Sequence, residues 1–257
     1  MKVGFTFEEK ILKNITLEKY LDFIKKQDID FIEFAVDLNT YSVKFYKKIF
    51  KKIKIKKHFH LPHFADENLD ISNFSVENFN YFSNYYDTLS KLNQNNKTNL
   101  IFHGSTYKDD KNQAFEKSSE FIKKSLDYMK NNNLNIHLSI ETLDKNHKNV
   151  IGNQIKELKK LSNKFDELNI CIDLIHLFYS NEKKIKKLSN NFFKKVNHYH
   201  IHGFENNTKH IPINNNKIIK KIIKNYPINN TPITIELLIC DNYLINLKKD
   251  INFLKSI

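Results

Sequence analysis

Three carboxylates and one histidine mark the ends of apolar runs in the second half of the chain. Glu141 ends IHLSIE, Asp173 ends ICID, His200 lies in VNHYHI and Glu236 lies in ITIEL. Carboxylates that converge on one place repel each other, so a shared site needs protons or a cation. Three carboxylates with one imidazole suit a divalent metal ion and leave positions open for a substrate. We therefore expect these four residues to form a metal site.

The alternation of side chains in the run VNHYHIH selects one histidine as the metal ligand. His198, His200 and His202 share one face if the run is a strand, whereas Tyr199 and Ile201 point toward the helices. His200 lies at the depth expected of a ligand. His198 lies deeper and is expected to be a hydrogen-bonded core histidine. His202 lies further toward the mouth, where it contacts the substrate or is exposed.

Eight short runs rich in β-branched and aromatic residues carry these side chains. The predicted strands are Lys2–Thr6, Phe31–Val36, Ile55–His60, Leu100–His103, Ile136–Glu141, Ile170–Asp173, Val196–Ile201 and Ile233–Leu237. The longer stretches between them are rich in Lys, Glu and Asn and have helical spacing, as in the apolar stripe Leu17, Tyr20, Leu21 and Ile24. Strands that alternate with helices indicate βαβ units and a parallel sheet.

Eight such units in 257 residues predict a single (β/α)8 TIM barrel over residues 1–257. An open Rossmann sheet is disfavoured because no G-x-G-x-x-G follows the first run. The active site of a barrel lies at the carboxyl ends of its strands. All four predicted metal ligands lie at those ends.

The charge of the chain is strongly positive, since 42 basic residues against 29 acidic ones give a formal net charge of +13. Such an excess can indicate a nucleic-acid partner. Every basic residue is Lys, however, and Arg is the residue preferred for bidentate phosphate and base contacts. The composition therefore argues mildly against a dedicated DNA-binding protein.

No run approaches 18 apolar residues, and MKVGFTFEEK has acids where a signal peptide needs its apolar region. We expect a cytoplasmic protein without membrane contact. Cys171 and Cys240 lie in apolar runs and are expected to be buried free thiols. A homo-oligomer is left open.

Short motifs at the predicted strand ends resemble the xylose-isomerase-like barrel superfamily, which includes sugar isomerases and epimerases, inosose-processing enzymes and endonuclease IV. In chain order the motifs are HLP at His60–Pro62, FHGS at Phe102–Ser105, IET at Ile140–Thr142, DLIH at Asp173–His176, HYHI at His198–Ile201, HIPI at His210–Ile213 and IEL at Ile235–Leu237. Each motif is short, but seven in the family's order, over nearly the whole chain, make the resemblance specific. FHGS lacks the family's proline, and Asn214 replaces a glycine.

The resemblance implies that Glu141, Asp173, His200 and Glu236 bind one divalent ion: Mn²⁺, Mg²⁺ or Co²⁺. In the sugar enzymes of this family, one glutamate removes a proton next to the carbonyl and the other returns it, while the metal stabilises the enediolate. Glu141 and Glu236 are the expected catalytic pair. The residues expected to bind substrate are His176, His60, His103, His202, His210 and Glu33.

Two enzyme classes remain open. The first is a metal-dependent isomerase or epimerase of carbohydrate metabolism, acting on a sugar, sugar phosphate or polyol. Glu33 in FIEF and the C-terminal stretch resemble the corresponding segments of those sugar enzymes, and the absence of Arg also favours this class.

Apart from these two enzyme classes, a third interpretation is a barrel that uses its site differently, for instance as a dehydratase, or that has lost activity.

The second class is an endonuclease IV-like hydrolase of abasic DNA with three Zn²⁺ ions. The positions of the extra zinc ligands are occupied by His60, His103, His176 and His210. Thr208, however, stands where the third zinc needs an aspartate. Nucleic acid is a partner only in this alternative.

Several aromatic side chains are expected close to the mouth of the barrel. His63 lies in a predicted loop over the site, while Phe64, Tyr107 and Phe178 closely follow strand ends. They either form walls of the pocket or fill the barrel mouth.

Overall fold

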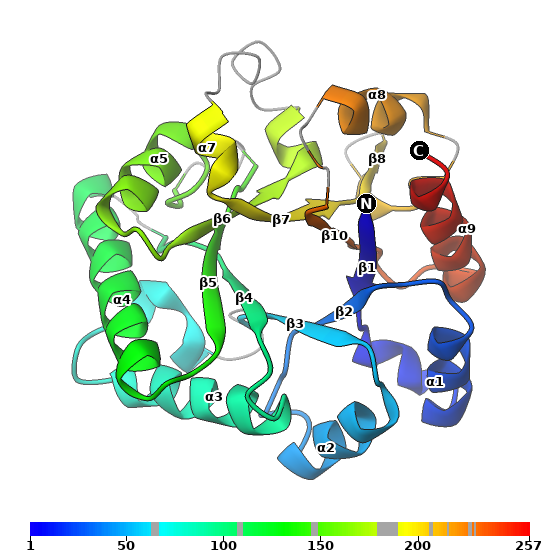
Figure 1. Cartoon of the computed structure of the whole chain (residues 1–257), viewed down its shortest axis with the longest axis horizontal. Coiled ribbons are helices and arrows are strands. Elements are labelled where there is room, and N and C mark those ends of the chain that lie inside the picture. Colours follow the sequence, from blue (N-terminus) through cyan, green and yellow to red (C-terminus); the bar gives the residue numbers. More distant parts are fainter. Residues whose placement is uncertain are drawn as a thin grey trace.

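The predicted (β/α)8 barrel is confirmed by a computed structural model. Eight parallel strands close into a barrel in the order β1-β10-β7-β6-β5-β4-β3-β2, and helices surround them (Figure 1). The described residues are 1–62, 67–106, 110–144, 149–178, 190–205, 208–214, 216–225, 228 and 230–257, with only the backbone described at 190 and 225.

The barrel strands are β1 (Lys2–Thr6), β2 (Phe31–Phe34), β3 (Lys56–His60), β4 (Thr98–Phe102), β5 (Ile136–Glu141), β6 (Asn169–Asp173), β7 (Val196–Ile201) and β10 (Pro232–Ile235). The helices are α1 (Leu17–Lys25), α2 (Val43–Lys52), α3 (Phe79–Leu92), α4 (Lys111–Asn131), α5 (Ile155–Lys164), α7 (Asn190–Lys194), α8 (Lys217–Asn225) and α9 (Tyr243–Lys255). A separate antiparallel hairpin, β8 (Gly203–Glu205) and β9 (Thr208–Ile211), follows β7 directly.

The predicted strand boundaries coincide with β1, β5 and β7 at both ends and differ by one or two residues elsewhere. The differences have a consequence for the site. His103 and Glu236 directly follow β4 and β10 instead of lying inside them. Both residues still lie at the carboxyl end of the barrel, and the backbone N–H of Glu236 continues the contact with β7 by donating to Ile201 O (2.9 Å).

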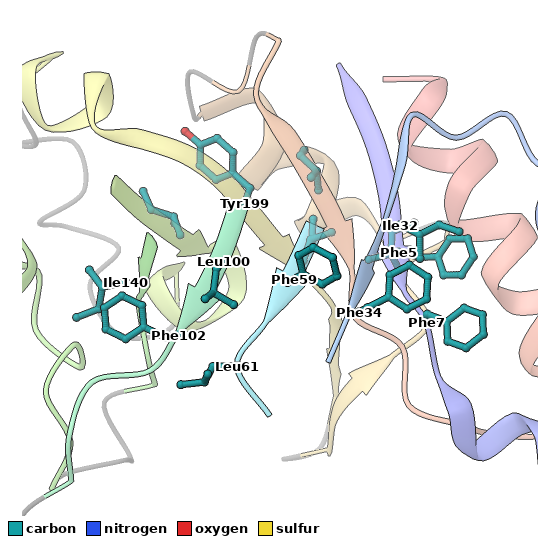
Figure 2. Close-up of a cluster of buried hydrophobic side chains, with 14 of the residues drawn as sticks. Phe5, Phe7, Ile32, Phe34, Phe59, Leu61, Leu100, Phe102, Ile140 and Tyr199 are labelled. Carbon is teal, nitrogen blue, oxygen red and sulfur yellow. The ribbon is translucent and has the colours of Figure 1, made fainter. Parts of the chain in front are cut away.

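Outward-facing side chains of the strands form the core against the helices. Phe34 on β2 packs on Phe50 of α2 with ring centroids 4.7 Å apart, and Phe102 on β4 lies 5.3 Å from Phe121 of α4. Figure 2 shows this layer, with Phe34, Phe102 and Tyr199 among its large rings. The aromatic and β-branched residues of the sequence runs thus supply the helix-facing side of the sheet.

Inward-facing side chains beneath the site form a polar network, where barrel interiors are usually filled by branched aliphatic residues. His58 donates from Nδ1 to His198 Nδ1 (3.2 Å), and His198 donates from Nε2 to Thr234 Oγ1 (2.7 Å). Thr234 donates in turn to Glu33 Oε2 (2.8 Å). Both ring nitrogens of His198 therefore have hydrogen-bond partners, which explains how its side chain can be buried, as expected. His58, which the sequence reading did not single out, belongs to the same network.

Gly104 lies where two backbones touch, directly above β4. A Cβ at this position would overlap the carbonyl group of Ile151, whose N–H donates to Ser105 O (2.9 Å). Because the contact is with backbone, it cannot be relieved by a rotamer change. We expect Gly104→Ala to lower the free energy of unfolding by about 2–4 kcal/mol, measured by urea denaturation. Glu120→Ala on the exposed face of α4 is the control, and an unchanged midpoint for Gly104→Ala would contradict the packing described.

Two further expectations concern the membrane and the thiols. No helix among the described residues has the length and apolar character to cross a membrane. Cys171 is buried, as expected, but Cys240 is exposed. The expectation for Cys240 was wrong because β10 ends at Ile235, and the apolar run continues into a surface segment.

Candidate metal centre

The four predicted metal ligands meet at the carboxyl ends of neighbouring strands. Ligand oxygens of Glu141, Asp173 and Glu236 lie within 4.8 Å of one another. His200 Nδ1 lies 2.9 Å from Glu141 Oε1 and 3.1 Å from Glu236 Oε1. Strands β5, β6, β7 and β10 are consecutive in the barrel, and Asp173 pairs with His200 across β6 and β7. The geometry agrees with the expected ligand set, whereas metal binding itself stays a prediction.

His200 is oriented from below by Glu33. The imidazole is fully buried, and its Nε2–H donates to Glu33 Oε2 (3.2 Å). Burial alone would lower the pKa of His200, but the neighbouring acidic groups, Cys171, Glu236 and Glu141, raise it well above the usual range. A carboxylate behind one ring nitrogen, with the other facing more carboxylates, is the usual surrounding of a metal-binding histidine.

Glu141 is held as a carboxylate by three imidazoles. His60 Nε2 lies 3.1 Å and His103 Nε2 lies 2.9 Å from its Oε2. Burial acts to raise the pKa of Glu141, but the charges of His200 and His103 and their hydrogen bonds hold it well below its usual range. The side chain is therefore ionised and carries lone pairs for a metal or a proton.

Asp173 provides the clearest test of whether a cation fits. Its Oδ1 accepts the backbone N–H groups of Ile175 (2.8 Å) and His176 (2.7 Å). Its Oδ2 is buried and has no hydrogen-bond partner among the described residues. An unpaired buried carboxylate oxygen is destabilising unless it is neutralised, so its presence beside two more carboxylates fits a bound cation.

Glu236 completes the set from the segment after β10. Its backbone N–H donates to Ile201 O (2.9 Å), which keeps the segment against β7. Burial acts to raise the pKa of Glu236, but the charge of His200 and its hydrogen bond lower it to about 2. His210 Nδ1 lies 3.6 Å from Oε2 on the other side.

A cavity of about 590 Å³ opens above this cluster. Its floor includes Glu141, Glu236, His60, His103 and His176. Its opposite wall is formed by segments after β1 and β2 together with the β8–β9 hairpin, and includes Glu8, Glu9, Lys10, Asp37, Lys209 and His210. The volume is that of an ordinary small-molecule site.

Comparison with known proteins adds the family. The model of the xylose isomerase-like TIM barrel matches residues 21–255. The chain belongs to this family. No curated protein sequence matched the chain significantly.

Solved structures similar to this xylose isomerase-like barrel share its fold at low sequence identity. A 3-keto-D-glucoside 4-epimerase from E. coli in its apo form superposes with a TM-score of 0.71 at 13% identity, covering 100% of both chains. D-Psicose 3-epimerase from Clostridium cellulolyticum H10, solved with D-tagatose, gives 0.66 at 16% identity, covering 98% of this chain and 91% of the other. The IolI protein with a bound zinc atom gives 0.65 at 16% identity, covering 100% and 96%.

The residues expected to bind substrate divide into two groups in this xylose isomerase-like barrel. Five of them line the cavity, namely His60, His103, His176, His210 and Glu33. His202 does not line it, so a contact with substrate stays a prediction, and because the side chain has no exposed surface the alternative that it is exposed was wrong. The physical reason is the hairpin, which folds back so that the His210 ring lies 4.2 Å from the His202 ring.

Glu33 lies at the bottom of the cavity, and its contacts indicate a positioning role. Its Oε2 accepts from Thr234, as above, and lies 3.1 Å from His198 Nε2 and 3.2 Å from His200 Nε2. Direct substrate contact by Glu33 stays a prediction. Among the aromatic candidates, Phe178 packs against the hydrophobic core and is not part of the cavity lining. His63, Phe64 and Tyr107 lie outside the described residues.

Apart from His210, the residues of the far wall of the cavity were not predicted from the sequence. Lys209 forms an ion pair with Asp144 (2.7 Å), which joins the hairpin to the segment after β5. Glu8 and Glu9 follow β1, and Glu9 accepts a hydrogen bond from Tyr46 (3.1 Å). The position of Glu8 and Glu9 shortly after the end of β1 could have indicated them. They were not selected because they lie further along the chain than the strand-end residues that meet at the barrel axis.

Glu9 should make the stability of the protein depend on pH. Burial raises its pKa from 4.5 to about 8, so between these values the folded chain holds a proton that the unfolded chain releases. Stability therefore falls as the pH rises from about 5 to 8. We expect Glu9→Gln to raise the melting temperature at pH 8 by roughly 2–6 °C and to change it little at pH 5. Glu120→Gln, on an exposed helix face, should shift neither value, and an equal effect of Glu9→Gln at both pH values would disprove the assignment.

Proposed function

We propose that this chain is a metal-dependent isomerase or epimerase that acts on a sugar or polyol by proton transfer through an enediolate. The observation that carries the proposal is the pairing of Glu141 with Glu236. Their carboxylates lie within 4.8 Å of each other and of Asp173, both contact His200 Nδ1, and both line the cavity. Two carboxylates at the same metal site can act on opposite faces of one substrate carbon, so that one removes a proton and the other returns it.

The residues Glu141, Asp173, Glu236 and His200 would hold the divalent ion. A donor set of three carboxylates and one imidazole suits Mn²⁺, Mg²⁺ or Co²⁺, and the structurally similar IolI protein was solved with zinc. When bound, the ion supplies Lewis-acid polarisation of the substrate carbonyl.

The two glutamates would exchange the proton next to that carbonyl. Both are ionised at neutral pH, so either can act as the base. Each also has an imidazole neighbour that can pass it a proton, since His60 lies 3.1 Å from Glu141 and His210 lies 3.6 Å from Glu236. His176, which lines the cavity, would hydrogen-bond a substrate hydroxyl.

The charge of the cavity favours an unphosphorylated substrate over a sugar phosphate. Acidic lining residues outnumber basic ones even without Glu9, whose raised pKa keeps it protonated at neutral pH: Glu8, Glu33, Asp37, Asp70, Glu141 and Glu236 against Lys10 and Lys209. Lys209 is already paired with Asp144. Phosphate is usually bound by Arg or Lys or by a helix amino terminus, and the chain contains no Arg. Carboxylates instead accept hydrogen bonds from sugar hydroxyls.

The test is solvent exchange at the carbon next to the carbonyl. Purified protein with Mn²⁺ in D₂O is incubated with ketohexoses, ketopentoses and their phosphates, and deuterium incorporation is followed by proton NMR. We expect incorporation into unphosphorylated ketoses and none with Glu236→Gln. If deuterium enters only the ketose phosphates, the substrate is a sugar phosphate and not an unphosphorylated sugar. If deuterium enters no ketose, the proposed reaction is refuted.

An endonuclease IV-like activity is the second candidate because one observation favours it. His60, His103 and Glu141 form a ligand group of the kind that an extra zinc ion needs. Against it, Thr208 is an exposed residue of β9 where a further zinc site requires an aspartate. If the protein cleaves abasic-site DNA in the presence of Zn²⁺, the nuclease activity takes the place of the sugar reaction as the proposed function.

A further inference from the structure

A chain of hydrogen bonds lies directly beneath the metal centre, in a place where most barrels hold aliphatic side chains. Its members, none of which has more than 1% of its surface exposed, are Glu33, His58, His198 and Thr234. Thr234 on β10 is the register partner of His200 on β7, so the two residues lie next to each other on neighbouring strands. Buried polar groups are destabilising unless they are paired, so a polar chain in contact with a predicted metal ligand indicates a role in that site.

The orientation of the Glu33 carboxylate depends on one of its two oxygens. Oε2 accepts from Thr234 Oγ1 (2.8 Å) and from His200 Nε2 (3.2 Å). Oε1 is buried and has no hydrogen-bond partner among the described residues. Loss of the Thr234 hydroxyl would therefore remove the shortest contact that fixes this carboxylate.

The direction of each hydrogen bond follows from which groups can donate. A carboxylate oxygen only accepts, so the single proton of the Thr234 hydroxyl points to Glu33. The hydroxyl oxygen then accepts from His198 Nε2 (2.7 Å), which also lies 3.1 Å from Glu33 Oε2. His198 Nδ1 is left as an acceptor for His58 Nδ1 (3.2 Å) and for the amide nitrogen of Asn99 (3.5 Å). His198 thus fixes the rotation of the hydroxyl that holds Glu33.

The same rule determines which nitrogen of His200 faces the metal. Nε2 must carry a proton, since its neighbour Glu33 Oε2 only accepts. Nδ1 lies 2.9 Å from Glu141 Oε1 and 3.1 Å from Glu236 Oε1, among the predicted ligands. A ring whose proton is held on Nε2 presents the lone pair of Nδ1 to a cation. If Glu33 turned away, the ring could instead carry its proton on Nδ1, where it would block coordination.

We propose that Thr234 and His198 are positioning residues of the metal centre. The Thr234 hydroxyl, oriented by His198, holds Glu33 against His200, so that His200 presents Nδ1 to the divalent ion. The inference rests on the metal centre of the proposed function but not on the reaction that takes place there. It predicts that a change in the barrel core, away from ion and substrate, alters the affinity for metal.

Thr98 provides a matched control for Thr234. Its side chain is also buried (2% exposed), and its hydroxyl donates to the backbone oxygen of Lys57 (2.6 Å). It lies at the start of β4, at the opposite end of the barrel from the metal ligands. Replacement by valine removes the hydroxyl at either position and nearly keeps the shape of the side chain, so both variants lose a buried hydrogen bond. Only at position 234 does that hydrogen bond lead to the metal centre.

The experiment measures Mn²⁺ binding to the full-length chain by calorimetry, after metal has been removed with a chelator. We expect Thr234→Val and His198→Phe each to weaken Mn²⁺ binding by about 10–100-fold. Thr234→Ser keeps the hydroxyl and should bind Mn²⁺ with nearly the Kd of the unaltered protein, as should Thr98→Val. Because Thr234 and His198 act through the same contact, the double variant should bind only about as weakly as the weaker single variant.

Three results would overturn the proposal while leaving the proposed function intact. An unaltered Kd in Thr234→Val would show that the hydroxyl does not act on the site. Equal weakening in Thr234→Ser would assign the effect to packing of the methyl group, and equal weakening in Thr98→Val would assign it to a general loss of stability. Absence of Mn²⁺ binding by the unaltered protein would instead refute the metal centre, and this inference with it. If circular dichroism shows that His198→Phe fails to fold, the comparison of valine with serine at position 234 decides alone.

Discussion

Replacement of Glu141 with Gln should lower kcat for ketose epimerisation by about 10²–10⁴-fold, because the amide can neither take the substrate proton nor serve as an anionic metal ligand. Its two carboxylate oxygens are also the atoms that His60, His103 and His200 contact. Initial rates measured at saturating Mn²⁺ distinguish a loss of proton transfer from a loss of bound metal. We expect kcat of Glu141→Gln to stay low even at saturating Mn²⁺.

A matched control for Glu141→Gln exists in the same chain. Glu157 is also buried, accepts the N–H of Gly152 (3.0 Å) and pairs with Lys111, but it lies on α5 outside the cavity. Glu157→Gln should cost stability and leave kcat within about twofold, since it touches nothing in the site. A Glu141→Gln enzyme that keeps more than a tenth of the activity would contradict the proposed role.

Metal binding should change the thermal stability of the protein strongly. Without an ion, the buried carboxylates of Glu141, Asp173 and Glu236 lie within 4.8 Å of one another, and their repulsion is relieved only in part by His200. A ligand present at 100–1,000 times its Kd stabilises the folded state by about 2.7–4.1 kcal/mol. For a chain of this size that corresponds to a rise of about 5–15 °C in the melting temperature. Differential scanning fluorimetry with chelator and then with Mn²⁺, Mg²⁺, Co²⁺ or Zn²⁺ measures it.

Two aspartates provide the comparison for this measurement. Asp173→Asn removes a ligand charge and should reduce the metal-dependent shift to less than about a third. Asp250→Asn removes a buried carboxylate that accepts from Ile213 and Asn214 instead, so it should keep the full shift. The same melting temperature for the unaltered protein with chelator and with every ion would rule out the metal centre.

The strand ends were readable from the sequence because they depend on local pattern. Runs of β-branched and aromatic residues predicted eight strands, and a closed parallel barrel has only one place where their carboxyl ends meet. Side-chain alternation then separated His200 from its neighbours, and His198 proved to be the hydrogen-bonded core residue expected. Family motifs in the correct order led to the same assignment.

Contacts across the barrel, between residues far apart in the chain, could not be predicted from local sequence patterns. Glu33 and His200 are far apart in the chain, and their pairing depends on how the strands stagger when the barrel closes. His58 joins the network beneath the site for the same reason. No local signal distinguishes an inward histidine that binds substrate from one that supports another side chain.

Residues 141, 173, 200 and 236 were thus determined as a cluster by the sequence alone, through strand ends and alternation. The tertiary structure alone decided how deeply their neighbours are buried and which side chains pair with them. The hairpin that follows β7 closes over His202 and turns an expected mouth residue into a buried one facing Asp173. Hairpin conformation and strand stagger depend on packing between distant segments, so burial and pairing appear only once the chain is folded.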